Sequence, residues 1–253
     1  MYKKSKFSKA FTLAEVLITL GVIGVVSALT LPILVNHHRN SVALAGLKVA
    51  YAKINDGFLF MRSDENVDDL RNLPVFREMD SENFQDEEVQ SSLDLQMRKY
   101  FNIVKSYKAG ESCADCPVYV QMNGELSAGG QYDYAWRGFS TDGMIYFMHL
   151  SGPQTAENTG KIQSIVAYFF VDINGTKLPN KWGKDMFQFA LAQNGLLYSA
   201  WGKELSEAMP QSQTYWGTNS SGCGSPANKD VSTSTGYACT ARIIENSWKI
   251  DYD

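Results

Sequence analysis

The best candidate for a ligand site is a short stretch in the second half of the chain, from residue 172 to residue 185. Its candidate ligands are Asp172, Asn174, Asn180 and Asp185. Calcium takes six to eight oxygen ligands from carboxylates, amides and carbonyls, so the stretch is a candidate calcium loop, although its glycine comes too early for an EF-hand. An Asx-type hairpin turn followed by a Pro-Asn turn would explain the same residues without an ion. Three lysines in the stretch also oppose a cation. We expect no other cofactor.

The four cysteines form two pairs that are local in sequence, Cys113 with Cys116 and Cys223 with Cys239. Four cysteines allow three connectivities, and local pairing is the simplest. In an oxidising compartment the pairs would be disulfides, whereas in the cytosol they would suggest metal or redox chemistry. A redox motif should open a helix after a strand, and a zinc site needs two further ligands. We therefore expect two local disulfides, with zinc and redox chemistry as the alternatives.

No catalytic constellation is recognisable, so we expect the protein not to be an enzyme. The three histidines are His37, His38 and His149, and the chain has no metalloprotease motif, nucleophile elbow or phosphate loop. The formal net charge is −4. The chain also lacks the basic, aromatic-interleaved stripe typical of a nucleic-acid binder. We therefore expect no nucleic-acid partner.

The N-terminal region has the composition of a membrane anchor. The first ten residues carry four lysines and no acid, and the twenty residues from Val16 to Val35 carry no charge. A helix of that length spans about 30 Å, the thickness of a bilayer core. The positive-inside rule places the N-terminus in the cytoplasm and the rest of the chain outside. The sequence thus predicts a single-pass membrane protein with an extracytoplasmic domain.

Glu15 is a carboxylate in an otherwise apolar run, Phe11 to Ile18. An unpaired charge in an apolar environment is costly. Either the side chain reaches water at the membrane interface, or it pairs with a cation on another subunit. The apolar residues on its N-terminal side favour the second explanation.

The segment from Lys9 to Gly24, with the basic leader before it, resembles the N-terminal signature of type IV prepilins and type II secretion pseudopilins. The resemblance implies that a prepilin peptidase cuts between Ala10 and Phe11 and that Phe11 is then N-methylated. It implies that Glu15 compensates the N-terminal amine of a neighbouring subunit during assembly. Pro32 matches a family proline where the long helix bends, and proline kinks helices for physical reasons as well. The family usually has glycine before the cut, where this chain has Ala10.

The resemblance implies a pilin-like structural subunit of a type II secretion pseudopilus or a type IV pilus. The size of the domain favours a minor subunit. Its location would be the bacterial inner (cytoplasmic) membrane and then the filament. Its partners would be other pilin or pseudopilin subunits, the prepilin peptidase and membrane lipid. The alternative is a prepilin-anchored surface binding module, adhesin-like, that acts through its C-terminal disulfide loop. The cargo or receptor is not identified.

Four segments follow from these patterns: a basic leader (1–10), a transmembrane helix (11–36), its amphipathic continuation (37–62) and a globular domain (63–253). In the continuation, apolar residues step by three and four, which predicts a helix face packed on the domain. These residues are Leu44, Leu47, Tyr51, Ile54, Phe58 and Met61. Asp56-Gly57 interrupts this region, and a bend is expected there because glycine weakens a helix.

The globular domain is predicted to be α+β, with the long helix packed on an antiparallel sheet, as the pilin resemblance also implies. Residues 63–82 are predicted to be a loop and Asp86–Tyr107 a second helix. Runs of β-branched and aromatic residues predict strands, and Asn194-Gly195 predicts a hairpin turn. The expected strands are Val118–Gln121, Met144–His149, Ile162–Ile173, Phe187–Gln193 and Leu196–Trp201.

Overall fold

A computed structural model describes residues 12–77, 85–127, 132–149, 154–155, 162, 164–208, 215, 220–224 and 230–252. The chain divides into two compact units, Met1–Val42 and Ala43–Asp253. The described part of the first unit is the beginning of one long helix. The second unit is an α+β domain, which agrees with the predicted fold class.

The long helix α1 runs from Leu13 to Asp64, a length of 52 residues. Its most apolar 18-residue window has a mean hydropathy of 2.4, and none of that window is buried. Side chains such as Leu17 and Leu34 are more than half exposed. By length and composition, α1 is therefore a candidate membrane span.

The part of α1 that belongs to the domain supplies one wall of the core. Leu47, Ile54, Phe58 and Met61 are at most 1% exposed, and the other two members of the predicted stripe, at positions 44 and 51, are partly buried against the same cluster. The predicted core face of this helix is thus confirmed. The helix continues through Asp56-Gly57 without interruption.

Gly57 is a position of close packing, and a bend of the helix there stays a prediction. A Cβ added there would lie 2.5 Å from the nearest ring carbon of Phe101, so the absence of a side chain lets the ring approach the helix backbone. The Phe101 ring in turn packs against Phe58, with their centroids 5.2 Å apart. The glycine that suggested a weak point in the sequence is therefore a close-contact position in the fold.

We predict that Gly57→Ala destabilises the domain by about 1–3 kcal/mol, the usual cost of overpacking a core. Helix propensity alone predicts the opposite, a gain of about 1 kcal/mol. Thermal or urea unfolding of the full chain in detergent measures the difference. Ala52→Gly, at an exposed position of the same helix, is the matched control and should cost only about 1 kcal/mol. A stabilised Gly57→Ala variant would contradict the packing role.

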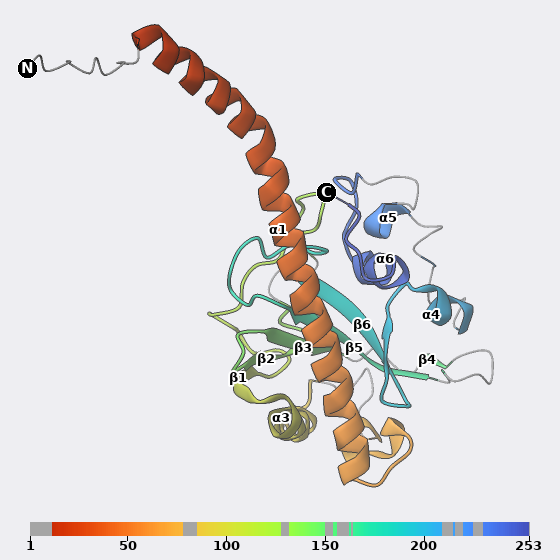
Figure 1. Cartoon of the computed structure of the whole chain (residues 1–253). Helices are drawn as coiled ribbons and strands as arrows, with labels where there is room; N and C mark the ends of the chain where they lie inside the picture. Colours follow the sequence, from red (N-terminus) through yellow and green to blue (C-terminus); the bar gives the residue numbers. More distant parts are fainter. Residues whose placement is uncertain are drawn as a thin grey trace, which may run out of the picture. The chain divides into compact units, whose positions relative to one another are not determined.

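In the part of the chain that the structure describes, the sheet has seven strands, all antiparallel to their neighbours; Figure 1 shows how they lie behind α1. Six follow the order β1-β2-β3-β5-β6-β7, and β4 pairs with the first residues of β5. The bounds are β1 Ile103–Tyr107, β2 Trp136–Ser140, β3 Ile145–His149, β4 Gln154–Thr155, β5 Ser164–Asp172, β6 Met186–Ala192 and β7 Leu197–Ser199.

Both faces of the central strand β5 are buried. Because side chains alternate along a strand, Phe169 and Val171 join the core cluster that includes α1, whereas Tyr168 and Phe170 join a second cluster on the other face. The second cluster includes Trp182, which belongs to the connection between β5 and β6. This connection is therefore part of a core, and its sequence is the candidate calcium loop.

The predicted second helix is shorter than expected and ends before a strand. Helix α3 runs from Glu87 to Phe101, and Asn102 after it has a φ of 51°. Asparagine tolerates this left-handed conformation and commonly ends helices. The β-branched residues Ile103 and Val104 then begin β1. The prediction that the helix continues to residue 107 is wrong.

Strands β3, β5 and the β6–β7 hairpin around Asn194-Gly195 confirm three of the predicted features. The strand predicted at Val118–Gln121 is wrong, since Val120 forms isolated bridges to Leu126 and Lys181 instead. Strands β1, β2 and β4 were not predicted. The remaining helices are η1 Leu70–Asn72, α2 Pro74–Arg77, α4 Lys203–Ala208, α5 Ser220–Cys223 and α6 Cys239–Glu245.

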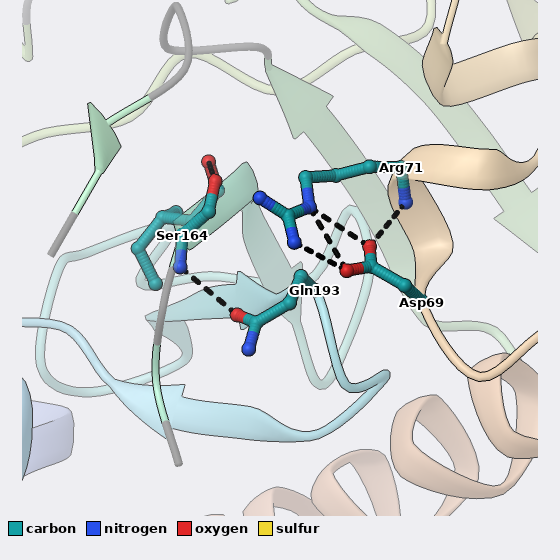
Figure 2. Close-up of polar contacts among 5 residues, drawn as sticks. Asp69, Arg71, Ser164 and Gln193 are labelled. Atoms are coloured by element: carbon teal, nitrogen blue, oxygen red, sulfur yellow. Dashed lines mark hydrogen bonds and ion pairs between the residues drawn. The ribbon is translucent and has the colours of Figure 1, made fainter. Parts of the chain in front are cut away.

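Two of these short helices lie in the segment that was predicted to be a loop, and polar contacts hold the first of them (Figure 2). The Asp69 carboxylate accepts hydrogen bonds from the backbone N–H and Nε of Arg71, at 2.8 and 2.9 Å. The Leu70 N–H donates to the Gln193 carbonyl at 2.7 Å, and the Gln193 side chain accepts from the Ser164 N–H at 3.0 Å. The turn after α1 is thereby tied, through Gln193 at the end of β6, to the start of β5.

Candidate functional site

Glu15 has a local partner at the start of α1. The Thr12 N–H and hydroxyl donate to Glu15 Oε2 at 2.8 and 2.9 Å, and the Glu15 N–H donates to Thr12 Oγ1 at 3.2 Å. This reciprocal arrangement is a capping box, which satisfies two of the free N–H groups at a helix start. The carboxylate is therefore hydrogen-bonded within the single chain, and its pairing with another subunit stays a prediction.

The predicted cleavage site and the predicted helix bend are the other two N-terminal features. Ala10 and Phe11 lie outside the described residues. Helix α1 continues through Pro32, so the helix is not broken there, and a bend at this proline stays a prediction. Thr12 was not singled out from the sequence, although Thr-x-x-Glu before an apolar run is a recognisable capping signature.

The cysteines form the two local disulfides that were expected. Cys113 is joined to Cys116 with their Cα atoms 5.4 Å apart, and Cys223 to Cys239 with theirs 5.0 Å apart. All four side chains are buried. The second bridge closes a loop of the C-terminal region and joins α5 to α6. Such a covalent closure mainly restricts the unfolded chain.

The structure brings the four residues of the candidate calcium loop together. The Asp172 Oδ1 accepts from the N–H groups of Asn174 and Gly175 at 3.0 and 2.8 Å, which is the predicted Asx-type turn. The Asp185 carboxylate accepts from the N–H groups of Asn180 and Lys181 at 2.8 and 2.6 Å. The two aspartates thus hold the two ends of one connection.

Asn174 and Tyr119 complete this cluster. The Asn174 Nδ2 donates to Asp185 Oδ2 at 3.3 Å. Asn174 therefore contacts Asp172 through its backbone and Asp185 through its side chain. The Tyr119 hydroxyl donates to Asp172 Oδ2 at 2.8 Å. Tyr119 lies 53 residues before Asp172, and no local pattern in the sequence connects the two.

In the described part of the chain, the two aspartates are buried without a cationic partner. Asp172 is 0% exposed and Asp185 2%, and among the described residues no lysine or arginine forms an ion pair with either. Burial, followed by the charge of Asp185, raises the pKa of Asp172 to about 8. Burial also raises the pKa of Asp185 to about 6. Two buried carboxylates near each other disfavour double ionisation.

The lysines of the loop do not neutralise this pair. Lys177 is exposed to solvent, and the Lys184 Nζ lies 5.5 Å from the ring centroid of Tyr252. Lys181 contributes its backbone N–H to Asp185. Among the described residues, the ammonium groups of these lysines form no ion pair with either carboxylate.

Two further oxygens fit a cation. Asn174 Oδ1 and Asn180 Oδ1 are both buried and have no hydrogen-bond partner, and Asn180 as a residue is 8% exposed. Such unsatisfied buried acceptors are uncommon and often mark an ion or water position. Carboxylates and amide oxygens are the kinds of ligand that a hard cation such as calcium takes. Among the described residues, no group of three or more His, Cys, Asp or Glu side chains is placed to hold a metal.

A separate open cleft of ≈ 940 Å³ lies beside the C-terminal region. Its lining combines aromatic rings with carboxylates from α1, β7, α4 and α6. The residues that carry these groups are Tyr51, Tyr198, Tyr215, Glu204, Glu207, Glu245 and Asp251. Asp251 is already paired with Arg242 at 2.8 Å.

No family model matches the chain, and no curated protein or solved structure matches it either. The N-terminal resemblance to prepilins therefore depends on the residues quoted for it.

Proposed function

We propose that the chain is a pilin-like structural subunit of an extracytoplasmic filament, a type II secretion pseudopilus or a type IV pilus, in which it is a minor component. Helix α1 carries the proposal. It is one helix of 52 residues, with apolar and exposed residues in its first part and the buried wall of an α+β domain in its last part. An apolar helix surface of this length requires a partner other than water. Lipid would provide it before assembly, and neighbouring subunit helices would provide it afterwards.

The charged residues of the N-terminus support the same proposal. Lysines precede the apolar run, which favours a cytoplasmic N-terminus and an extracytoplasmic domain. Disulfides persist in oxidising compartments outside the cytoplasm, and two disulfides in the domain fit that orientation. We place the chain in the bacterial inner membrane, with a prepilin peptidase cutting between Ala10 and Phe11.

Dependence on the peptidase tests this function. The full chain is expressed in a bacterium with a working prepilin peptidase and in a matched strain without it. We expect a chain shorter by ten residues that is recovered partly with sheared surface filaments in the first strain, and full-length chain confined to membranes in the second. Ala10→Gly, which restores the usual family residue, should be cut at least as fast. Identical chain length and location in both strains would contradict the proposal.

We also propose that the loop from residue 172 to residue 185 binds a divalent cation such as calcium. The observation that favours it is the pair of unpartnered buried oxygens, on Asn174 and Asn180, in the same loop as two buried aspartates that have no cationic partner among the described residues. A ligand at 100 times its dissociation constant stabilises the folded state by about 2.7 kcal/mol. Calcium titrated into chelator-treated protein should therefore raise the unfolding temperature by several degrees. No shift with calcium, magnesium or manganese would contradict the site.

A further inference from the structure

The open cleft beside the C-terminal region is built around the last strand of the sheet. Strand β7 ends the strand order, and both α4 and α6 contact it. The floor of the cleft is apolar, because the side chains of Leu197 and Leu205 are at most 3% exposed and Ile244 is partly buried. Its volume of ≈ 940 Å³ lies within the range of about 300–1,000 Å³ that is usual for ligand sites. The cleft is therefore large enough for several residues of an extended chain.

Contacts within the chain hold the walls of the cleft in place. The ring of Tyr51 packs against those of Phe189 and Trp248, with centroids 5.7 and 5.4 Å apart. Glu245 Oε1 accepts a hydrogen bond from the Lys203 N–H at 2.5 Å, which joins the end of α6 to the start of α4. Binding to walls that are already fixed costs less conformational entropy than binding to mobile ones. The cleft is therefore preorganised for a partner.

Four carboxylates and one ammonium group line the cleft, so its formal charge is negative. These groups belong to Glu204, Glu207, Glu245, Asp251 and Lys203. Arg242 pairs with Asp251 at 2.8 Å. The Lys203 Nζ lies 3.8 Å from Glu207 Oε1, and both side chains are 68% exposed, so this pair contributes little and can exchange partners. Among the described residues, Glu204 forms no ion pair. A cationic partner therefore meets carboxylates that the lining itself does not fully neutralise.

The arrangement suits an extended cationic ligand rather than a metal ion. In the described part of the chain, no three or more His, Cys, Asp or Glu side chains are placed to hold a metal, so the carboxylates of the cleft do not converge on one point. Tyr51 and Tyr198 also line the cleft. Burial raises the pKa of Tyr198, and the nearby charge of Glu204 raises it further. A guanidinium group binds carboxylates through paired N–H donors and stacks on aromatic rings. An arginine side chain therefore matches both kinds of lining group.

We propose that this cleft binds a basic, partly apolar peptide segment of a partner protein. The basic side chain of the segment pairs with Glu204 and Glu207 and lies on the ring of Tyr198. Its apolar neighbours pack on Leu196, which is 39% exposed, and on Ile244. The sign of the charges selects this partner chemistry, because like charges across an interface repel an acidic segment. The inference goes beyond the proposed function, since it uses only residues of the second unit and does not require a filament.

Fluorescence anisotropy of a labelled synthetic peptide of alternating arginine and leucine measures binding to the full chain in a non-ionic detergent. A peptide of the same length with glutamate in place of arginine should not bind. Glu204→Gln combined with Glu207→Gln should weaken binding of the arginine peptide about fivefold, the loss expected for exposed ion pairs. Glu87→Gln combined with Glu88→Gln is the matched control. These carboxylates at the start of α3 are also exposed, and Glu87 likewise lies 3.8 Å from a lysine. The control removes the same charge and should leave binding unchanged.

Hydrogen exchange measured with the arginine peptide bound locates the site. We expect slower exchange in residues 196–208 and 244–251 and unchanged exchange in α3. The proposal is overturned if the arginine peptide does not bind saturably, if the two double variants weaken binding equally, or if slowing appears only outside these two segments. None of these measurements depends on processing of the N-terminus. Their failure would therefore leave the filament function standing, and a failure of processing would leave the cleft standing.

Discussion

Glu15→Ala and Glu15→Gln should both remove the chain from filaments, with a loss of about tenfold or more in the incorporated fraction. In the proposed assembly the carboxylate compensates the N-terminal amine of a neighbouring subunit in an apolar environment. Removing one partner of a desolvated charge pair typically costs about 2–5 kcal/mol. Quantitative immunoblotting of sheared filaments against the membrane fraction measures the loss.

The glutamine variant separates this role from the one that the structure shows. Glutamine can replace glutamate in a capping box, so Glu15→Gln should keep the contacts with Thr12 that begin α1. Thr12→Ala is the reciprocal control, since it removes the capping partner and keeps the charge. If Glu15→Gln incorporates normally while Thr12→Ala does not, capping rather than charge is the function of Glu15, and the assembly role is wrong.

The second large effect concerns the pH dependence of stability in the cation-free protein. The pKa of Asp172 is raised to about 8 and that of Asp185 to about 6, from an ordinary value of 3.8. At a pH between the ordinary pKa and the raised pKa, each aspartate is protonated in the folded state and ionised in the unfolded state. The folded state then binds more protons, so stability falls as pH rises. We expect the chelator-treated protein to lose on the order of a few kcal/mol between pH 5 and pH 8.

Asp172→Asn should remove most of this loss. The amide is neutral and isosteric, and its oxygen can still accept the N–H groups of Asn174 and Gly175. Urea unfolding at several pH values measures the slopes, with and without calcium. The variant should be more stable than the natural chain at pH 8 in chelator and should respond less to calcium. An unchanged pH slope in Asp172→Asn would show that this carboxylate is not the group responsible.

The core face of α1 and the β6–β7 hairpin could be predicted from the sequence, because short-range patterns determine both. The apolar stripe of α1 is set by spacing along one helix, and the β6–β7 hairpin is marked by Asn194-Gly195. Strand β1 was missed because its signal is a single residue, Asn102 in the left-handed conformation, inside what read as one helix. Strand β2 contains Gly138, which weakens strand propensity. A Cβ there would lie 2.3 Å from the ring of Trp136, so packing explains this glycine.

Some features of the candidate site could likewise be predicted from the sequence, whereas others depend on tertiary packing. Its four oxygen-bearing residues were visible in one short stretch, because a single connection carries them all. The direction of the lysine side chains and the contact of Tyr119 with Asp172 depend on tertiary packing. No spacing rule in the sequence supplies them. The capping partner Thr12, in contrast, could have been predicted from its three-residue spacing to Glu15.

The mass of the N-terminal peptide, from protein recovered from native membranes, tests the central claim most directly. We predict a chain that begins at Phe11 and carries one methyl group, about 14 Da above the unmodified peptide. That result would show processing by a prepilin peptidase. A chain that begins at Met1, or that has lost Met1 alone, would contradict the proposed filament subunit and would make the anchored binding module the better explanation.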